Sequence, residues 1–262
     1  MEILAYIFAV FIGVVLGLLG GGGSILTVPI LVYLLAIPAY NATSYSLFVV
    51  GVTSLAGSLT YMKQKLVDFK AAVLFSIPSF IGVLITRKIL LPSLPDSLLS
   101  IGEFELTKNL AIMVLFSVLM ILASYSMIRK NNINVEKKEQ SILQLIIKFF
   151  FVGVFLGLVG AGGGFLIIPS LIFFAKLDMK TAVGTSLLII SVNTLVGFLG
   201  DLTTDIIFDW NLLILFSGLA LIGIYIGIKI SKLIDGKKLK PIFGWFILFM
   251  GIYIITKELI IK

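Results

Sequence analysis

The 262-residue chain contains no cysteine and no histidine. Without cysteine it can form no disulfide, thiolate metal site or cysteine nucleophile. Without histidine it lacks the side chain that most often changes its charge near neutral pH, which is also the commonest metal ligand. Since the apolar segments offer no carboxylate either, we expect no acid–base or metal chemistry, and therefore no enzyme and no cofactor.

Charge is also scarce: 13% of the residues are charged, 60% are hydrophobic, and the mean hydropathy is +1.19. Several apolar segments are about 20 residues long, enough to cross a hydrocarbon core of roughly 30 Å. They are continuously apolar rather than alternating, which favours helices over a β-barrel. We therefore expect an all-α, multi-pass membrane protein, whose net charge of +7 reflects basic cytoplasmic loops and not nucleic-acid binding.

The apolar segments fall into full spans and broken ones. Full spans are predicted at Ala42–Met62, Ala71–Thr86, Asn109–Ile128, Thr181–Gly200, Leu212–Ile230 and Ile242–Thr256. Two further blocks are each split by glycine, into Ile3–Leu19 with Ile25–Ala36 and into Ile142–Val159 with Phe165–Ala175. Residues 87–108 are expected to form a loop. The N-terminus lacks the basic region of a cleaved signal peptide.

The two interruptions are the glycine runs Gly20-Gly21-Gly22-Gly23-Ser24 and Gly160-Ala161-Gly162-Gly163-Gly164. Glycine costs a helix about 1 kcal/mol per position relative to alanine, so a run of glycines should end the helix. Irregular backbone survives at membrane depth only where protein or a water-filled cavity satisfies its polar groups. The runs therefore predict paired helix breaks that form the walls of a site.

The second half of the chain repeats the first. A constant shift of 140 maps residues 11–57 onto 151–197 without a gap and with 18 identities in 47 pairs. With one residue inserted, Asp68-Phe69 matches Asp209-Trp210. We therefore divide the chain into a first repeat at 1–128, a cytoplasmic linker at 129–141 and a second repeat at 142–262.

The distribution of lysine and arginine indicates how the repeats are oriented. If each broken segment crosses the membrane once, the 20 basic residues divide 10 and 10 between the two faces; if each returns to its own side, they divide 15 and 5. The positive-inside rule favours the second arrangement, with both termini extracytoplasmic and the two repeats inverted. Each repeat would then hold a re-entrant-like hairpin followed by three spans. Two short crossings in place of a re-entrant half-helix remain an alternative.

A glycine run that leads into a helix exposes backbone N–H groups at the positive end of the helix dipole, which favours an anion. The candidate binding residues are the two glycine runs together with hydroxyl and amide side chains of the following spans, Thr53, Thr185, Ser186 and Asn193. Each hydroxyl could instead bond its own helix backbone. Gly13, Gly17, Gly153 and Gly157 are spaced for close helix packing, and Asp68 and Asp209 for helix capping.

No predicted span carries a charged residue in its interior, which disfavours a cation pump. A membrane potential that is negative inside drives an anion outward with about 2.3 kcal/mol per charge per 100 mV. For a divalent anion this supports a gradient on the order of a thousandfold per 100 mV, with no coupling ion. The membrane potential alone is therefore sufficient to drive export of such an anion by a uniporter.

The segments GLLGGGGSILTVPIL and GLVGAGGGFLIIPSL, with the turns around Asp68 and Asp209, resemble the two signature repeats of the TauE/SafE sulfite exporter family. The resemblance implies a permease of the prokaryotic plasma (inner) membrane that exports sulfite or a small organosulfur anion. Its partners would be that anion and the lipid bilayer, with no nucleic acid. The alternatives are an uptake permease for another small anion and a non-transporting membrane assembly factor. The oligomeric state stays open, a homo-oligomer included.

Overall fold

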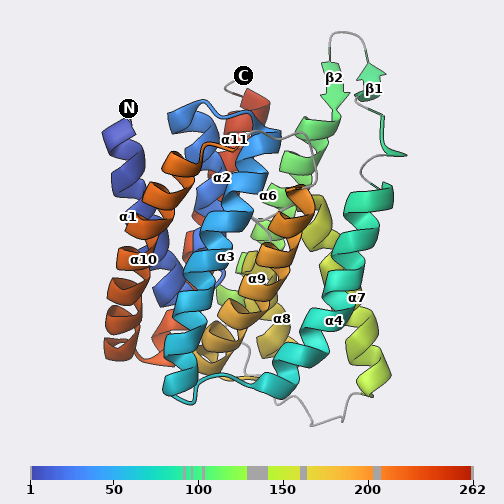
Figure 1. Ribbon diagram of the computed structural model, residues 1–262. Helices are drawn as coiled ribbons and strands as arrows, with labels where there is room; N and C mark the ends of the chain where they lie inside the picture. The colour runs from blue at the N-terminus through green and yellow to red at the C-terminus, as the bar shows by residue number, and fades with distance from the viewer. Residues whose placement is uncertain are drawn as a thin grey trace.

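The computed structural model describes residues 2–90, 93–95, 97–101, 104–128, 141–159, 164–202 and 208–260, and these form a nearly all-helical bundle (Figure 1). The helices of the first half are α1 (Glu2–Leu19), α2 (Gly22–Leu35), α3 (Ala39–Lys63), α4 (Phe69–Ile85) and α6 (Lys108–Ile128). Those of the second half are α7 (Ile142–Val159), α8 (Ile167–Phe173), α9 (Met179–Asp201), α10 (Trp210–Leu233) and α11 (Gly236–Ile260).

Within the described ranges, five helical segments are long and apolar enough to cross a membrane. They comprise α3, α4 with its continuation, α9, α10 and α11, which match five of the six predicted spans. The sixth prediction corresponds to α6, whose apolar part, Leu110–Tyr125, falls into the shorter class together with α1, α2, α7 and α8. Many large apolar side chains on the outer helix faces are exposed, as expected for surfaces that contact lipid.

Described parts of the predicted loop at 87–108 have regular structure instead. Helix α4 continues as a π-helical turn, η1 (Thr86–Leu90), and two antiparallel strands follow, β1 (Ser97–Ile101) and β2 (Phe104–Thr107). The prolines and mixed charge of this region suggested a loop. The short alternation of apolar and polar residues in β2, which suits a strand, was too brief to stand out beside them.

The largest helix–helix interfaces all join the first half of the chain to the second: α1 packs on α10, α4 on α7, α3 on α9 and α6 on α11. Under the sequence repeat, α1 corresponds to α7 and α10 corresponds to α4, so the first two interfaces are equivalent. Individual contacts repeat as well. A Cβ atom at Gly223 would collide with the carbonyl oxygen of Val10, and one at Gly82 would collide with that of Phe150, the residue that matches Val10.

Glycines allow these helices to approach closely. A Cβ atom at Gly13 would collide with the carbonyl oxygen of Ala220, and one at Gly153 would collide with that of Ser79, the residue that matches Ala220. Gly17 lies in the same way against the carbonyl oxygen of Ile224. The predicted packing role of the Gly-xxx-Gly spacing is therefore confirmed.

Helices α3 and α9 form the centre of the bundle and are the most buried of the candidate spans. They run antiparallel. Near the start of α3 the Ser44 Oγ donates a 2.6 Å hydrogen bond to Asp201 Oδ2 at the end of α9. Beyond the end of α3, the Leu66 carbonyl oxygen lies against Gly184 in the first turns of α9.

Figure 1 places both chain termini at one end of the bundle and the α3–α4 and α10–α11 connections at the opposite end. A 3.2 Å hydrogen bond from Tyr61 Oη to Ser231 Oγ ties the last turns of α3 and α10 together there. A lysine of the second half lies near the start of a helix at this end of the bundle. Lys148 lies in the second turn of α7, where its Nζ is 4.9 Å from the centroid of the Phe174 ring.

Candidate anion site at the first glycine break

The break between α1 and α2 is narrower than predicted. The Gly20 N–H still donates to the Leu16 carbonyl oxygen at 2.8 Å, and Gly20 then turns the chain with a φ of +67°. Gly21 is the N-cap residue of α2, which begins at Gly22. The prediction that the break extends through Gly22, Gly23 and Ser24 is therefore wrong, because these residues form the first turn of α2. A single residue in the left-handed conformation is enough to reverse the chain.

Position 23 requires glycine for lack of space and not for its backbone conformation. A Cβ atom there would overlap the Leu16 side chain and lie 2.6 Å from the Ile12 carbonyl oxygen. The missing side chain lets α2 fold back closely against α1, and the two helices share an extensive interface. Because α2 begins three residues earlier than predicted, Pro29 lies in the helix interior instead of near its start.

The first glycine segment meets the end of the second. A Cβ atom at Gly21 would collide with the Gly164 carbonyl oxygen and lie 2.9 Å from the Phe165 backbone nitrogen. Gly164 is buried and opens a 3₁₀ turn that leads into α8. The predicted residues Gly160, Ala161, Gly162 and Gly163 lie outside the described residues.

Ser186 of α9 lies at the same place. A Cβ atom at Gly20 would be 2.6 Å from Ser186 Oγ and 2.9 Å from Cδ1 of Ile168. The Ser186 side chain is fully buried, and its hydroxyl donates a 2.8 Å hydrogen bond to the Val183 carbonyl oxygen. The break is thus lined by backbone from both halves and by one hydroxyl oxygen.

The other predicted side chains make contacts elsewhere. Thr185 Oγ1 accepts a 2.9 Å hydrogen bond from the Asp68 N–H, and Thr53 Oγ1 donates one of 2.6 Å to the Val49 carbonyl oxygen of its own helix. Asn193 lies two turns beyond Ser186 on α9, about 10 Å along the helix.

Asn193 bridges α9 and α4. Its Nδ2 is 3.5 Å from Ser79 Oγ, and its Oδ1 is buried with no hydrogen-bond partner among the described residues. A buried amide oxygen without a partner is uncommon in folded proteins. As a hydrogen-bond acceptor it can bind a donor such as water, but not an anion.

Three further buried serines are not among the candidate binding residues predicted from the sequence. The Oγ atoms of Ser46, Ser54 and Ser217 are buried and have no hydrogen-bond partner in the described part of the chain. Ser46 is the residue that matches Ser186 in the repeat, which is the sequence signal that could have identified it. Ser46 and Ser54 both lie on α3, so the central helix pair carries unpaired hydroxyls as well as the contact with Gly20.

The sequence of residues 5–254 matches the profile of the sulfite exporter TauE/SafE family. The match covers nearly the whole chain, so the protein belongs to this family of membrane transporters, and it is not an enzyme.

Several curated relatives carry the name "Probable membrane transporter protein". One from Xylella fastidiosa (strain 9a5c) is 28% identical over 255 residues, covering 94% of this chain and 92% of the relative. A Bacillus subtilis (strain 168) relative, YunE, is 28% identical over 224 residues, covering 74% and 77% of the two chains. A relative from Methanocaldococcus jannaschii is 26% identical over 264 residues, covering 94% of each. No solved structure matches the chain.

Proposed function

We propose that this transporter exports sulfite or a small organosulfur anion across a prokaryotic plasma membrane, and that the anion binds near the membrane midplane between the two glycine segments. The observation that carries the proposal is the contact of Gly21 with Gly164 and Phe165, since it brings together two segments that each interrupt an apolar helix. The family name supplies the class of substrate.

The chemistry of the break suits an anion. The start of an α-helix is the positive end of its dipole and favours negative charge, and α2 starts at the break. Gly20, Gly21 and Gly23 are buried, so little solvent screens that charge. Ser186 lies beside Gly20 and would donate to an anion by exchanging its bond to the Val183 carbonyl oxygen. Asn193, two turns away, would donate through Nδ2. All these groups are neutral, which allows the anion to bind without a permanent counter-charge that would slow its release.

We further propose that the two halves are inverted repeats. The antiparallel packing of α3 on α9 and the equivalent α1–α10 and α4–α7 interfaces support a two-fold axis perpendicular to the helices. If these helices cross the membrane, that axis lies in the membrane plane. The basic α3–α4 and α10–α11 connections then face the cytoplasm, with both termini outside. Rocking of one half against the other would expose the glycine segments to each face in turn.

The test is efflux from proteoliposomes loaded separately with labelled sulfite, thiosulfate, sulfate and a sulfonate. The proposal expects efflux of sulfite or of an organosulfur anion that rises when the potential drives anions outward. Efflux that ignores the imposed potential would contradict export by uniport. Transport of an unrelated anion alone would favour the uptake permease, and absence of any flux from folded protein would favour an assembly factor.

A further inference from the structure

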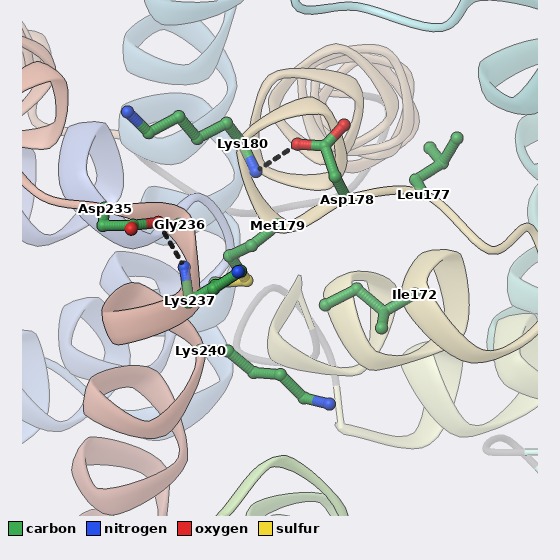
Figure 2. A pocket seen from close by; sticks show the side chains of 9 residues that line it. All are labelled: Ile172, Leu177, Asp178, Met179, Lys180, Asp235, Gly236, Lys237 and Lys240. Carbon is green, nitrogen blue, oxygen red and sulfur yellow. Dashed lines mark hydrogen bonds between the residues drawn. The ribbon is translucent and has the colours of Figure 1, made fainter. Parts of the chain in front are cut away.

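A basic cleft opens at the end of the bundle opposite the chain termini, between the α8–α9 turn and the α10–α11 turn (Figure 2). Its volume is about 570 Å³. A water molecule takes up about 30 Å³ of the liquid, so the space is far larger than a small inorganic anion requires. Its wall combines three lysines with apolar side chains: Lys180, Lys237 and Lys240 with Ile172, Leu177 and Met179.

The two carboxylates of the cleft are engaged in helix capping. Asp178 Oδ1 accepts hydrogen bonds from the N–H groups of Lys180 and Thr181 at 3.0 and 3.2 Å, and its Oδ2 accepts one from Thr181 Oγ1 at 2.6 Å. Asp235 Oδ1 accepts from the Lys237 N–H at 3.0 Å. Both carboxylates thus bind backbone at the starts of α9 and α11, where the helix dipoles favour negative charge.

The capping bonds of both carboxylates thus go to backbone and to Thr181, and not to the three lysine side chains. Figure 2 shows the Lys237 side chain extending toward Met179, and the Lys180 and Lys240 side chains extending in opposite directions, with Lys180 pointing away from Asp178. The Lys240 ammonium lies 5.3 Å from the centroid of the Phe173 ring on α8. Three lysines against two aspartates leave the lining with a net charge of +1.

The matching turn of the first half has the same backbone and none of this charge. Lys176 has a φ of +56° and matches Ala36, which has a φ of +53°. The turns are closed by equivalent hydrogen bonds, from Leu177 N to Leu171 O at 3.3 Å and from Ile37 N to Leu31 O at 3.1 Å. Lys180 is likewise replaced by Tyr40. The backbone does not require lysine, and the positive-inside rule accounts for basic side chains at this end of the bundle. The cleft adds that these charges lie beside apolar side chains.

We propose that this cleft binds the headgroup of an anionic phospholipid, with the phosphate among the lysine ammonium groups and the glycerol and first methylenes against Ile172, Leu177 and Met179. A small soluble anion would gain nothing from the apolar wall, whereas an amphiphile uses both parts of the lining. Basic pockets between membrane helices on the cytoplasmic side are suited to such headgroups. The site binds lipid independently of transport, so lipid binding and anion flux can be measured separately.

The test uses the full chain in phosphatidylcholine nanodiscs with and without phosphatidylglycerol, and counts retained lipids by native mass spectrometry. The variant Lys180→Gln/Lys237→Gln/Lys240→Gln removes the cleft charges. The variant Lys63→Gln/Lys70→Gln/Lys232→Gln removes the same charge from exposed positions at the same end of the bundle and serves as the control. Thermal unfolding verifies that both variants are folded.

The wild type and the control should retain phosphatidylglycerol, and the cleft variant should bind it about fivefold more weakly per lysine removed, or about a hundredfold in total. Equal losses in both variants would reduce the effect to general surface charge and overturn the site. Failure of the wild type to retain the lipid would also overturn it. Displacement of the lipid by inorganic phosphate would assign the cleft to a soluble anion instead.

Discussion

The backbone N–H of Asp68 donates a 2.9 Å hydrogen bond to Oγ1 of Thr185, which joins the start of α4 to α9 in the other half of the chain. The equivalent bond of the repeat is also present. The Asp209 N–H donates to Oη of Tyr45 at 2.6 Å, and Tyr45 matches Thr185. The two bonds use different side chains at matched positions and tie each half to the central helix of the other.

The same aspartates cap the helices that follow them, as predicted. Asp68 Oδ1 accepts a 2.9 Å hydrogen bond from the Ala71 N–H, and Asp209 Oδ1 accepts one of 3.0 Å from the Leu212 N–H. Each aspartate thus fixes both the start of a helix and the position of that start against the other half.

Replacing Thr185 by valine should therefore destabilise the protein. Thr185→Val keeps the shape of the side chain but leaves the Asp68 N–H without its acceptor, at a cost of about 1 kcal/mol or somewhat more. We expect the Tm in detergent to fall by a few degrees. The control is Thr194→Val in the same helix, because the Thr194 hydroxyl donates to the Ile190 carbonyl oxygen of its own helix. An equal fall in both variants would contradict the cross-half role of Thr185.

The close approach of α1 to α10 gives a second stability prediction. Gly13→Ala places a Cβ atom against the Ala220 carbonyl oxygen, which belongs to the backbone and cannot move aside without shifting a helix. We expect a loss of about 1–3 kcal/mol or failure to fold. Gly218→Ala in α10 meets no atom within 4 Å and should be neutral or stabilising by up to about 1 kcal/mol. If Gly13→Ala is as stable as Gly218→Ala, the interface is looser than the structure indicates.

Much of this fold could be predicted from the sequence, because apolar length and glycine spacing act locally. The bounds predicted for α7 are those observed, and the packing glycines and capping aspartates were identified correctly. The width of the first break could not be predicted, because propensity assigns a similar penalty to every glycine of the run. Within this run the left-handed conformation falls on Gly20, whereas Gly21 and Gly23 are needed because a Cβ atom there would meet Gly164 and α1 respectively.

The arrangement of the site side chains was harder to predict. Thr185 and Ser186 are neighbours in sequence and looked equivalent, yet only Ser186 lies against Gly20 while Thr185 faces Asp68. Which face of α9 points to the break depends on how α3 and α9 pack, and periodicity cannot give this for a helix that is buried on most sides.

Asp178 gives a prediction about acid stability. Burial raises the pKa of its carboxyl group, but hydrogen bonds from Thr181 and Lys180 outweigh burial, so the pKa lies below its ordinary value of 3.8. The charged form therefore stabilises the fold above that value and loses this effect as the pH falls through the lowered pKa. Relative to Asp178→Asn, the Tm advantage of the wild type should be constant near neutral pH and shrink toward about pH 3. An advantage that grows on acidification would contradict the direction of the shift.

Because the chain contains no cysteine, single cysteines can report its orientation in the membrane. Lys88 follows the end of α4 and Lys232 lies in the last turn of α10, and both are exposed. The ends of these two helices lie at opposite ends of the bundle (Figure 1). In intact cells a membrane-impermeant maleimide should label Lys88→Cys, and it should label Lys232→Cys only after permeabilisation. Labelling of both in intact cells, or the reverse pattern, would contradict the proposed placement of the basic end in the cytoplasm.

The central claim, that an anion crosses where the two glycine segments meet, is tested most directly by potential-driven efflux of labelled sulfite from proteoliposomes containing Gly21→Val. The added side chain would occupy the contact with Gly164 and Phe165. Because this is a clash with backbone, Gly21→Val should also lose stability, so flux is measured on the folded fraction isolated by size-exclusion chromatography. We predict that this folded fraction loses at least nine-tenths of the flux, on the order of 1.4 kcal/mol or more in the transport barrier, while Gly218→Ala retains the wild-type flux. Wild-type flux through folded Gly21→Val would contradict the claim.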